Sequence, residues 1–384
     1  MLNNSQGDAP QPIGDQRPRR VMFAYWGRRG ALSRFALDLA HAAVKVPNLE
    51  PIISIARSNE LFDQFAKFNS VLLPVDTFST ATGAARLDKL LKFRQQITQE
   101  VRRRKVDAVV ALMPHVWAPF IISPLRASGC RYAVISHDAS PHPGDMTAIV
   151  NRWLMNEVRR ADMVITLSQA VAGRLSARGI VDWHRIYPLF HPDFNYGPQL
   201  SPKFPAPGKP FRLLSFGRLL EYKALPMLLD AMDILREDGI AIELGVYGEG
   251  NISSLRERLA NLRVEVQNKW IADSELRTIC QNYHAMVLSH VEASQSGVVA
   301  AAHGLGLPVI VTPVGGLPEQ VRNMQTGMVT EHADAFSLSQ AIAQLAQNRE
   351  LYERIHHHIL QTAEDRSMER FVKDLVAHVC YARH

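Results

Sequence analysis

Two cations, Arg218 and Lys223, stand where they could act on an anion. Both follow the apolar segment 211–216, which we predict to be a buried strand, and Gly217 separates them from it. Arg presents a planar fork of donors and Lys a compact charge, so the pair suits a phosphate or diphosphate. For Lys223 alone a surface ion pair with Glu221 is the alternative, whereas two cations after a strand-end glycine favour phosphate binding.

A second candidate lies in segment 286–321. It has the pattern of a strand at 286–288, a polar loop at 289–296, a helix that begins at Gly297 and a further strand at 308–311. The first N–H groups of a helix are free, its dipole is positive there, and small residues let an anion approach the backbone closely. An ordinary crossover with a solvated loop is the alternative.

The elements that must position these residues form two halves. Apolar segments of strand length alternate with segments of helical spacing, which predicts parallel sheets. Residues 191–210 interrupt this pattern with six prolines and two glycines and indicate a linker. We predict an α/β fold of two doubly wound, Rossmann-like domains that face each other across a cleft, with the chemistry in the loops after the strands. The predicted parts are a disordered tail at 1–19, domains at 20–196 and 211–366, a linker at 197–210 and a C-terminal helix at 367–384.

The composition is that of a soluble globular protein, because 47% of the 384 residues are apolar and 21% are charged. The net charge of +6 suits an anionic partner such as a nucleotide, a phospholipid headgroup or a nucleic acid. Cys130, Cys280 and Cys380 are far apart and favour a reducing, cytoplasmic setting over a disulfide framework or a zinc site. Residues 1–20 lack the apolar core of a signal peptide, and segment 106–125 is interrupted by Asp and Pro, so we expect no membrane span there.

Residues 84–105 are expected to form a basic amphipathic helix. Eight Lys and Arg residues supply its charge. Its predicted apolar stripe consists of Leu87, Leu90, Leu91, Ile97 and Val101. An ordinary surface helix and a peripheral contact with an anionic membrane both fit this pattern.

Several short motifs of the C-terminal half occur in a recognisable order. They are Gly217-Arg218 with Lys223, the turn Gly248-Glu249-Gly250, Glu292, the run 297–306, the strand 308–310, and Gly315-Gly316 with Glu319. This ordered set resembles the retaining nucleotide-sugar glycosyltransferases of family 4, which have the GT-B fold. The resemblance is dense over residues 211–347 and thinner over the N-terminal half, where Gly27–Gly30, His137-Asp138 and Val164–Ser168 match.

The resemblance implies a role for each matching residue. His137 would contact the transferred sugar, Glu292 would lie near the donor sugar, and Arg218 and Lys223 would meet the leaving diphosphate. The donor would be bound by Gly217, Gly248, Gly250, Ser294, Gln295, Ser296, Gly297 and Val298. The acceptor would be bound in the N-terminal domain, on which the helix 367–384 would pack, by Gly27, Arg28, Gly30, Ser33 and Asp138.

Some of these assignments have structural alternatives. His137 could be a buried histidine that bonds to backbone, and Glu292 a solvated loop acid. His142 and Asp145 follow in the same loop as His137 and have weaker claims on the site.

The chain departs from the family pattern at one point. Family members carry two acidic residues eight positions apart, and counting back from Pro308 places these positions at Ala293 and Ala301. Glu292 stands for the first acid only through a shift of one residue. The second acid holds the ribose hydroxyls in the family, and Gln295 and Ser296 are the candidates to replace it.

These features predict a retaining glycosyltransferase that moves a hexose from a UDP- or GDP-sugar to a glycan or lipid-linked glycan in bacterial polysaccharide or lipopolysaccharide synthesis. Retention is implied by the family, through a route in which the donor phosphate accepts the proton of the acceptor. No Asp-x-Asp motif follows a strand, so we expect neither a metal nor another cofactor. We expect a cytoplasmic enzyme in peripheral contact with the inner face of the plasma membrane, and no nucleic-acid partner. The alternative is a non-catalytic nucleotide-sugar-binding protein on a degenerate GT-B scaffold.

Overall fold

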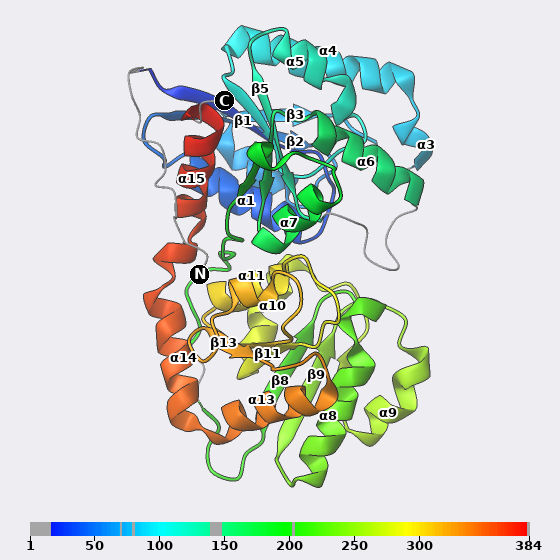
Figure 1. The fold of residues 1–384 in the computed structure, drawn as a ribbon, viewed down its shortest axis with the longest axis vertical. Helices are drawn as coiled ribbons and strands as arrows, with labels where there is room; N and C mark the ends of the chain where they lie inside the picture. The colour runs from blue at the N-terminus through cyan, green and yellow to red at the C-terminus, as the bar shows by residue number, and fades with distance from the viewer. Residues whose placement is uncertain (1–16, 70, 79–80, 139–147, 202–203, 382–384) are drawn as a thin grey trace. The chain divides into compact units, whose positions relative to one another are not determined.

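The chain divides into two compact units (Figure 1). The computed structural model describes residues 17–69, 71–78, 81–138, 148–201 and 204–381. Within those limits, unit 1 comprises residues 17–189 and 368–381, and unit 2 comprises residues 190–367. Most of the predicted tail at 1–19 lies outside the described residues, as do His142 and Asp145.

Unit 1 is built on a sheet of seven parallel strands in the order β3-β2-β1-β4-β5-β6-β7. All four residues of β4 are buried, as are those of β6, which is typical of strands covered on both faces. The order reverses direction between β1 and β4, which pair with Ala24 opposite Ala111. The strands are β1 Arg19–Tyr25, β2 Leu49–Ala56, β3 Leu72–Val75, β4 Ala108–Ala111, β5 Arg131–Ser136, β6 Met163–Thr166 and β7 Ile186–Pro188.

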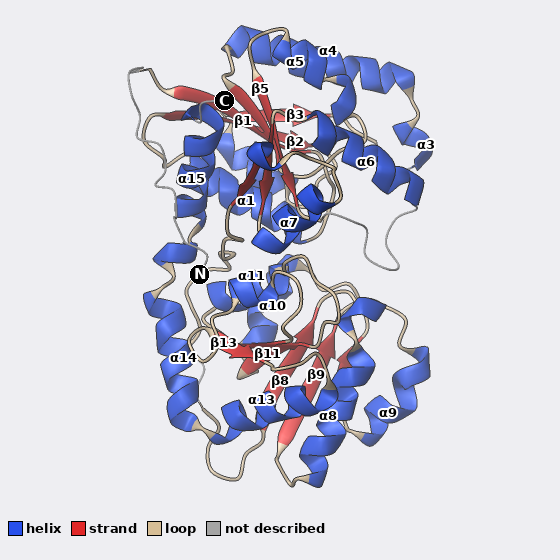
Figure 2. Cartoon of the chain, in the orientation of Figure 1, coloured by secondary structure: helices blue, strands red, loops and turns tan. Residues whose placement is uncertain are grey.

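Helices connect these strands and cover the sheet on both faces (Figure 2). The α-helices of unit 1 are α1 Ala31–Ala43, α2 Phe62–Phe65, α3 Ala81–Ala84, α4 Leu87–Arg104, α5 Ile122–Arg126, α6 Ala148–Arg160, α7 Gln169–Ala177 and α15 Met368–Tyr381. Short 3-10 turns lie at η1 Ala66–Phe68, η2 Ala118–Phe120 and η3 Trp183–Arg185.

The last helix, α15, belongs to unit 1 although it follows all of unit 2 in the sequence. It lies beside α1 (Figure 1), where the rings of Phe35 and Phe371 meet edge to face with centroids 5.6 Å apart. Lys45 and Glu369 form an exposed ion pair at 2.9 Å along the same contact. Buried aromatic packing rather than this exposed pair accounts for most of the attachment, because an exposed ion pair contributes about 1 kcal/mol or less.

Unit 2 repeats the same topology with six parallel strands in the order β10-β9-β8-β11-β12-β13. The order reverses direction between β8 and β11, where Ala285 lies opposite Leu213. The strands are β8 Phe211–Phe216, β9 Ile242–Tyr247, β10 Glu265–Gln267, β11 Ala285–Leu288, β12 Val309–Val311 and β13 Gly327–Val329.

The helices of unit 2 again lie on both faces of the sheet, with α8 and α13 packed side by side (Figures 1 and 2). The α-helices are α8 Leu225–Glu237, α9 Arg256–Asn261, α10 Asp273–Cys280, α11 Gly297–Gly304, α12 Leu317–Gln320, α13 Ala335–Gln347 and α14 Arg349–Gln361. The 3-10 turns are η4 Glu221–Lys223, η5 Ser253–Leu255 and η6 Glu364–Arg366.

The predicted fold class is confirmed, because both units are doubly wound parallel α/β structures. No helix in the described ranges is both long and apolar enough to cross a lipid bilayer.

The predicted apolar stripe of the basic helix is only partly right. In α4 the side chains of Phe93, Ile97 and Val101 are buried, whereas Leu87 and Leu91 are 64% and 51% exposed. The helical period explains the difference, because at 3.6 residues per turn Leu91 lies about 160° and Leu87 about 120° around the helix axis from Phe93.

Candidate functional site

The reversal of strand order in unit 2 marks the place where a doubly wound sheet binds ligands. The carboxyl ends of β8 and β11 flank this switch point, so the loops 217–223 and 289–296 lie on either side of it. These two loops carry several of the predicted donor-binding residues, and Gly248 and Gly250 lie in the loop after β9.

Glycines allow the loop after β8 to lie directly against the loop after β9. Gly217 has a φ of 95° and its N–H donates to the carbonyl of Tyr247 at 2.9 Å. A Cβ on Gly248 would overlap the carbonyl oxygen of Gly217, and one on Gly250 would overlap the carbonyl oxygen of Leu219. Side chains are therefore excluded at Gly248 and Gly250 by backbone, which cannot give way as a flexible side chain would.

Lys223 lies over this glycine contact. A Cβ on Gly217 would stand 2.9 Å from the Lys223 Nζ, which donates to the carbonyl of Phe216 at 3.3 Å. Burial and the nearby Arg218 guanidinium lower the pKa of Lys223 to about 8. In the described part of the chain Lys223 forms no ion pair, with Glu221 or any other acid. The ammonium is thus half-buried beside a second cation, an arrangement that an anion would stabilise.

The loop after β11 is bonded to the turn that carries Lys223. The hydroxyl of Ser289 donates to the carbonyl of Lys223 at 2.8 Å, and the N–H of Val291 donates to the carbonyl of Tyr222 at 2.8 Å. The rings of Tyr222 and His290 also lie 5.6 Å apart. These contacts bring the two predicted halves of the donor site, the cation pair and the loop 289–296, together on one edge of the sheet.

Within this loop the predicted donor residues differ in exposure. Glu292 is half-buried, whereas Ser294 is buried with Ala293. The Oε1 atom of Gln295 is buried and has no hydrogen-bond partner among the described residues. An acceptor without a partner at this edge is available to a ligand hydroxyl.

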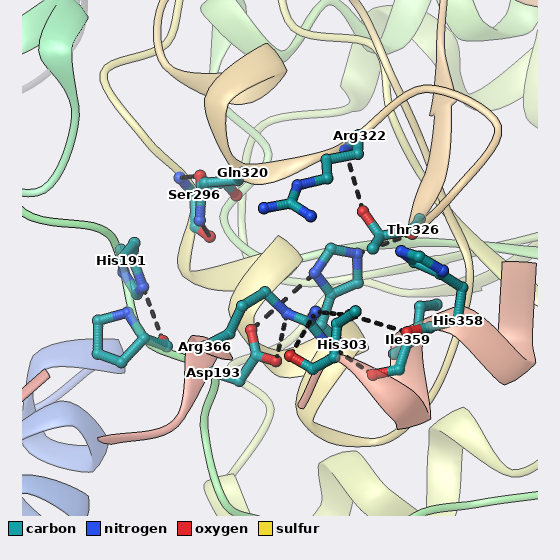
Figure 3. Close-up of polar contacts among 12 residues, drawn as sticks. His191, Asp193, Ser296, His303, Gln320, Arg322, Thr326, His358, Ile359 and Arg366 are labelled. Carbon is teal, nitrogen blue, oxygen red and sulfur yellow. Dashed lines mark hydrogen bonds and ion pairs between the residues drawn. The ribbon is translucent and has the colours of Figure 1, made fainter. Parts of the chain in front are cut away.

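Ser296 is held in place by Gln320 (Figure 3). The Gln320 Oε1 accepts the Ser296 N–H at 2.6 Å, and the Gln320 Nε2 donates to the Ser296 carbonyl at 3.1 Å. The Ser296 hydroxyl caps α11 by accepting the N–H of Val298 at 3.2 Å. The polar groups of Ser296 and the N–H of Val298 are therefore already hydrogen-bonded within the protein. Gly297 lies between these two residues. Gln320 was not predicted, although it follows the Gly315-Gly316 motif that the sequence marks.

The departure from the family pattern has a structural counterpart. Ala293 and Ala301, where the two acids of the family would fall, are 4% and 2% exposed. Both methyl groups are therefore packed in the interior of unit 2.

In unit 1, His137 follows β5. Its Nε2 lies 2.8 Å from the carbonyl of Leu112, the residue after β4, and its ring meets that of Phe35 edge to face. Burial lowers the pKa of His137, an effect larger than the opposing influence of Asp138. A neutral imidazole that donates from Nε2 keeps Nδ1 as an acceptor.

The predicted acceptor loop after β1 is largely engaged in internal contacts. The N–H of Gly30 donates to the Glu60 carboxylate at 2.7 Å, so this acid occupies the N-terminus of α1. Ser33 is buried and receives a hydrogen bond from Asn59 at 3.1 Å, and Asn59 also bonds the carbonyl of Gly27 at 3.0 Å. Arg28 is the exposed side chain of the set. Ser33 thus supports the loop from inside.

His115 is a residue that sequence reasoning missed. It follows β4 at the switch point of unit 1, with its ring 5.5 Å from that of Trp26 and 5.3 Å from that of Phe78. Burial lowers the pKa of His115 to about 3, so the ring is neutral. Its backbone N–H donates to the buried Glu157, whose pKa burial raises to about 8. The sequence signal that could have identified His115 is its place in the apolar segment 106–125. The strand β4 ends within this segment, and His115 follows that end.

Three comparisons with known proteins bear on these sites. Residues 210–348 match the family described as Glycosyl transferases group 1. WcaL of Salmonella typhimurium, named as a glycosyltransferase of colanic acid biosynthesis, is 25% identical over 229 residues, which are 56% of this chain and 53% of WcaL. AmsK of Erwinia amylovora, named as an amylovoran biosynthesis glycosyltransferase, is 26% identical over 149 residues, covering 36% of this chain and 37% of AmsK. The chain spans about half the length of the first of these relatives and less of the second.

Solved structures extend the likeness to the whole chain. Alr3699/HepE of Anabaena, in complex with UDP and glucose, superposes with a TM-score of 0.70 at 15% identity and covers 94% of this chain and 99% of its own. A glycosyltransferase from Rickettsia africae superposes with a TM-score of 0.70 at 16% identity, covering 96% and 100%. At such low identity the likeness shows the fold. The chain therefore has the GT-B fold, and its residues 210–348 match the group 1 glycosyl transferases.

Unit 2 contains a further polar cluster, which the sequence analysis did not predict (Figure 3). Arg366 donates from Nε to the Asp193 carboxylate at 2.9 Å, and His303 of α11 approaches the same carboxylate at 4.0 Å. Burial raises the pKa of Asp193 to about 7 although Arg366 lowers it, and burial with Arg366 lowers the pKa of His303 to about 3. His303 is therefore neutral, and the ion pair of the cluster is Asp193 with Arg366.

No group of three or more His, Cys, Asp or Glu side chains within the described ranges is placed to hold a metal ion.

Replacing Gly248 by Ala is expected to destabilise unit 2 by about 3 kcal/mol or more, because the new Cβ meets backbone of the loop after β8. Gly239→Ala is the matched control: its φ is also positive, 71°, but a Cβ there meets nothing within 4 Å. The control is expected to cost about 1–2 kcal/mol through backbone strain alone. Hydrogen exchange in β8 and β9 measures both losses, and equal losses would contradict the close approach at Gly217.

Proposed function

We propose that the protein is a retaining glycosyltransferase that moves a hexose from a UDP- or GDP-sugar to a glycan or lipid-linked glycan acceptor in bacterial polysaccharide or lipopolysaccharide synthesis. The observation that carries the proposal is the half-buried ammonium of Lys223, which lies against Gly217 and beside Arg218 at the switch point of unit 2. The names of WcaL and AmsK support a role in polysaccharide synthesis, and the complex of Alr3699/HepE with UDP and glucose supports a nucleotide-sugar donor.

The chemistry requires cations at the leaving group. As the bond between the sugar and the diphosphate breaks, negative charge grows on the departing phosphate oxygen, and preorganised cations stabilise it most effectively. Lys223 and Arg218 supply two positive charges. We propose a front-face route, in which the departing phosphate oxygen accepts the proton of the acceptor hydroxyl while that hydroxyl oxygen bonds to the sugar on the same face. This route needs no protein nucleophile, in contrast to the double displacement of glycosidases.

Other contacts to the donor can be proposed from the hydrogen bonds and the protonation of each side chain. Ser296 is occupied by Gln320 and by its capping role, so of the two residues proposed to replace the missing ribose acid we favour Gln295, whose buried Oε1 has no partner in the described chain. Glu292 is proposed to contact the donor sugar. The neutral ring of His137 is proposed to bond a sugar hydroxyl, and Arg28 with Asp138 to meet the acceptor.

The second candidate is a nucleotide-sugar-binding protein without turnover. It is favoured by one observation, the buried Ala301 where the family carries the acid that binds ribose. The two functions differ in whether the bond between the sugar and the diphosphate of the donor is broken.

Sugar transfer separates them. The wild type is expected to release UDP or GDP from a matching sugar donor when a glycan or lipid-linked acceptor is present. Lys223→Met is expected to lower kcat/KM by about 100- to 1000-fold, because the departing charge loses a preorganised cation. Lys269→Met, which removes an exposed lysine paired with Glu275, is the control and should leave kcat/KM unchanged. Nucleotide binding without release, for every donor and acceptor tried, would favour the binding protein.

Nucleotide affinity should also follow the protonation of Lys223. Because the pKa of this group is about 8 in the free protein, its charge is present below that pH and lost above it. The terminal phosphate of UDP is fully ionised above about pH 7, so UDP affinity is expected to fall roughly tenfold between about pH 7.5 and pH 9.5. Lys223→Arg keeps its charge and should give a flat profile by calorimetry. A wild-type profile that is equally flat would rule out Lys223 as the phosphate ligand.

We also propose that α4 docks on an anionic membrane surface. Its outward side exposes Leu87 and Leu91, together with Arg94, while its other side is buried. Five cations of this region form no ion pair among the described residues; they are Lys89, Lys92, Arg94, Arg102 and Lys105. Exposed leucines flanked by unpaired cations suit the boundary between anionic headgroups and acyl chains.

Vesicle flotation tests this contact. The wild type is expected to bind vesicles that contain phosphatidylglycerol more strongly than vesicles of phosphatidylcholine alone, and less at high salt. Leu87→Glu should reduce the bound fraction severalfold. Phe336→Glu is the control, because Phe336 is 65% exposed on α13 of unit 2. Equal binding by Leu87→Glu and the wild type would exclude α4 as the contact.

A further inference from the structure

The helix at the proposed diphosphate site, α11, has little stability of its own. It has eight residues, begins and ends with glycine, and contains three alanines. Helices shorter than about 12 residues are marginal in isolation, so neighbouring segments must fix the position of α11.

One of these neighbours is the segment 191–194, which runs along the second half of α11. The N–H of Phe194 donates to the carbonyl of Ala300 at 3.1 Å. A Cβ on Gly304 would overlap the carbonyl oxygen of Phe194, so the backbone of this segment lies directly on the helix. A shift of the segment would therefore move α11 or break these contacts.

Asp193 anchors this segment through Arg366 (Figure 3). The Asp193 N–H donates to the Arg366 carbonyl at 2.8 Å, and its carboxylate accepts from the guanidinium at 2.9 Å. Arg366 in turn donates to the carbonyls of Ile359 and Thr362 at the end of α14, at 2.9 and 3.1 Å. The guanidinium is thus fixed from several directions, and it holds the segment at one position beside α11.

The same carboxylate faces α11 itself, because the ring of His303 lies 4.0 Å from it. His303 is locked on its other side, where Nε2 lies 2.9 Å from the carbonyl of Thr326. Asp193 is therefore the point at which the end of α14, the segment 191–194 and the donor helix meet.

We propose that Asp193, held by Arg366, is a positioning residue for the donor site: it sets the placement of α11 and so the aim of the Gly297 N–H toward the donor diphosphate. This role rests on the proposed function, since it assumes that a nucleotide binds at α11. Neither residue touches the nucleotide.

Two variants and a control test the role. Asp193→Asn keeps the shape of the side chain and removes its charge, and Arg366→Met removes the other partner. Asp233→Asn is the matched control, because Asp233 is bound by Arg258 at 2.6 Å on the helices α8 and α9. The readouts are UDP affinity by calorimetry and hydrogen exchange at residues 297–299.

Asp193→Asn and Arg366→Met are each expected to weaken UDP binding about tenfold and to speed exchange at residues 297–299, and the double variant should be no weaker than either single one. The control should stay within twofold of the wild type. A lowered melting temperature with unchanged affinity and exchange would make the pair merely structural and overturn the proposal. Should Asp193→Asn not fold, Arg366→Lys, which retains the charge but loses the fork, replaces it with the same criteria. If no nucleotide binds the wild type, the proposed function fails, and exchange at residues 297–299 alone then decides the positioning role.

Discussion

The arrangement of unit 2 depends on holding a half-buried ammonium group, that of Lys223, where no carboxylate of the described chain forms an ion pair with it. Lys223 fits there because Gly217 has no side chain to meet its ammonium, and Gly248 lets the loop after β9 lie against Gly217. Moving a charge into a protein interior is unfavourable, and the depressed pKa of Lys223 records that penalty. The electrostatic penalty on the ammonium is relieved when an anion binds beside it. The same penalty that destabilises the free protein therefore strengthens the binding of a diphosphate.

The two units use the same topology differently. In unit 2 the edge at the switch point is cationic, whereas in unit 1 the N-terminus of α1 is met by the Glu60 carboxylate and the neighbouring His115 and His137 are neutral. An anionic ligand is therefore favoured at the switch point of unit 2, whereas the N-terminus of α1 in unit 1 is already met by a carboxylate. This asymmetry is consistent with a phosphate-bearing donor on one unit and an uncharged hydroxyl group on the other, and it arises from a few side chains on otherwise similar sheets.

The sequence predicted those parts of the molecule whose local structure is determined by residues that are close together along the chain. Continuous short apolar runs such as 108–111 and 285–288, bounded by polar residues, indicate buried strands, and glycines after strands indicate close loops. The sequence did not predict contacts between distant residues. Asp193 and Arg366 lie 173 positions apart, and Gln320, which follows β12, bonds Ser296, which follows β11. For α4 the composition was right and Ile97 and Val101 are buried as predicted, but periodicity alone did not choose between Leu91 and Phe93.

Position 301, where the family carries the acid that binds ribose, is an alanine in this chain, and this difference bears on the contacts that place α11. Ala301 is packed inside unit 2, and a carboxylate there would have to reach a ribose from a helix whose other contacts are already tight. In this chain α11 is instead built from small residues, capped by Ser296 and bounded by Gln320 at one end and by Phe194 at the other. On the proposed function, orientation of the nucleotide would then come less from a charged side chain on the helix and more from where the helix backbone lies. The contacts that place α11, which are remote from the proposed ligand, would thereby determine how the donor is held.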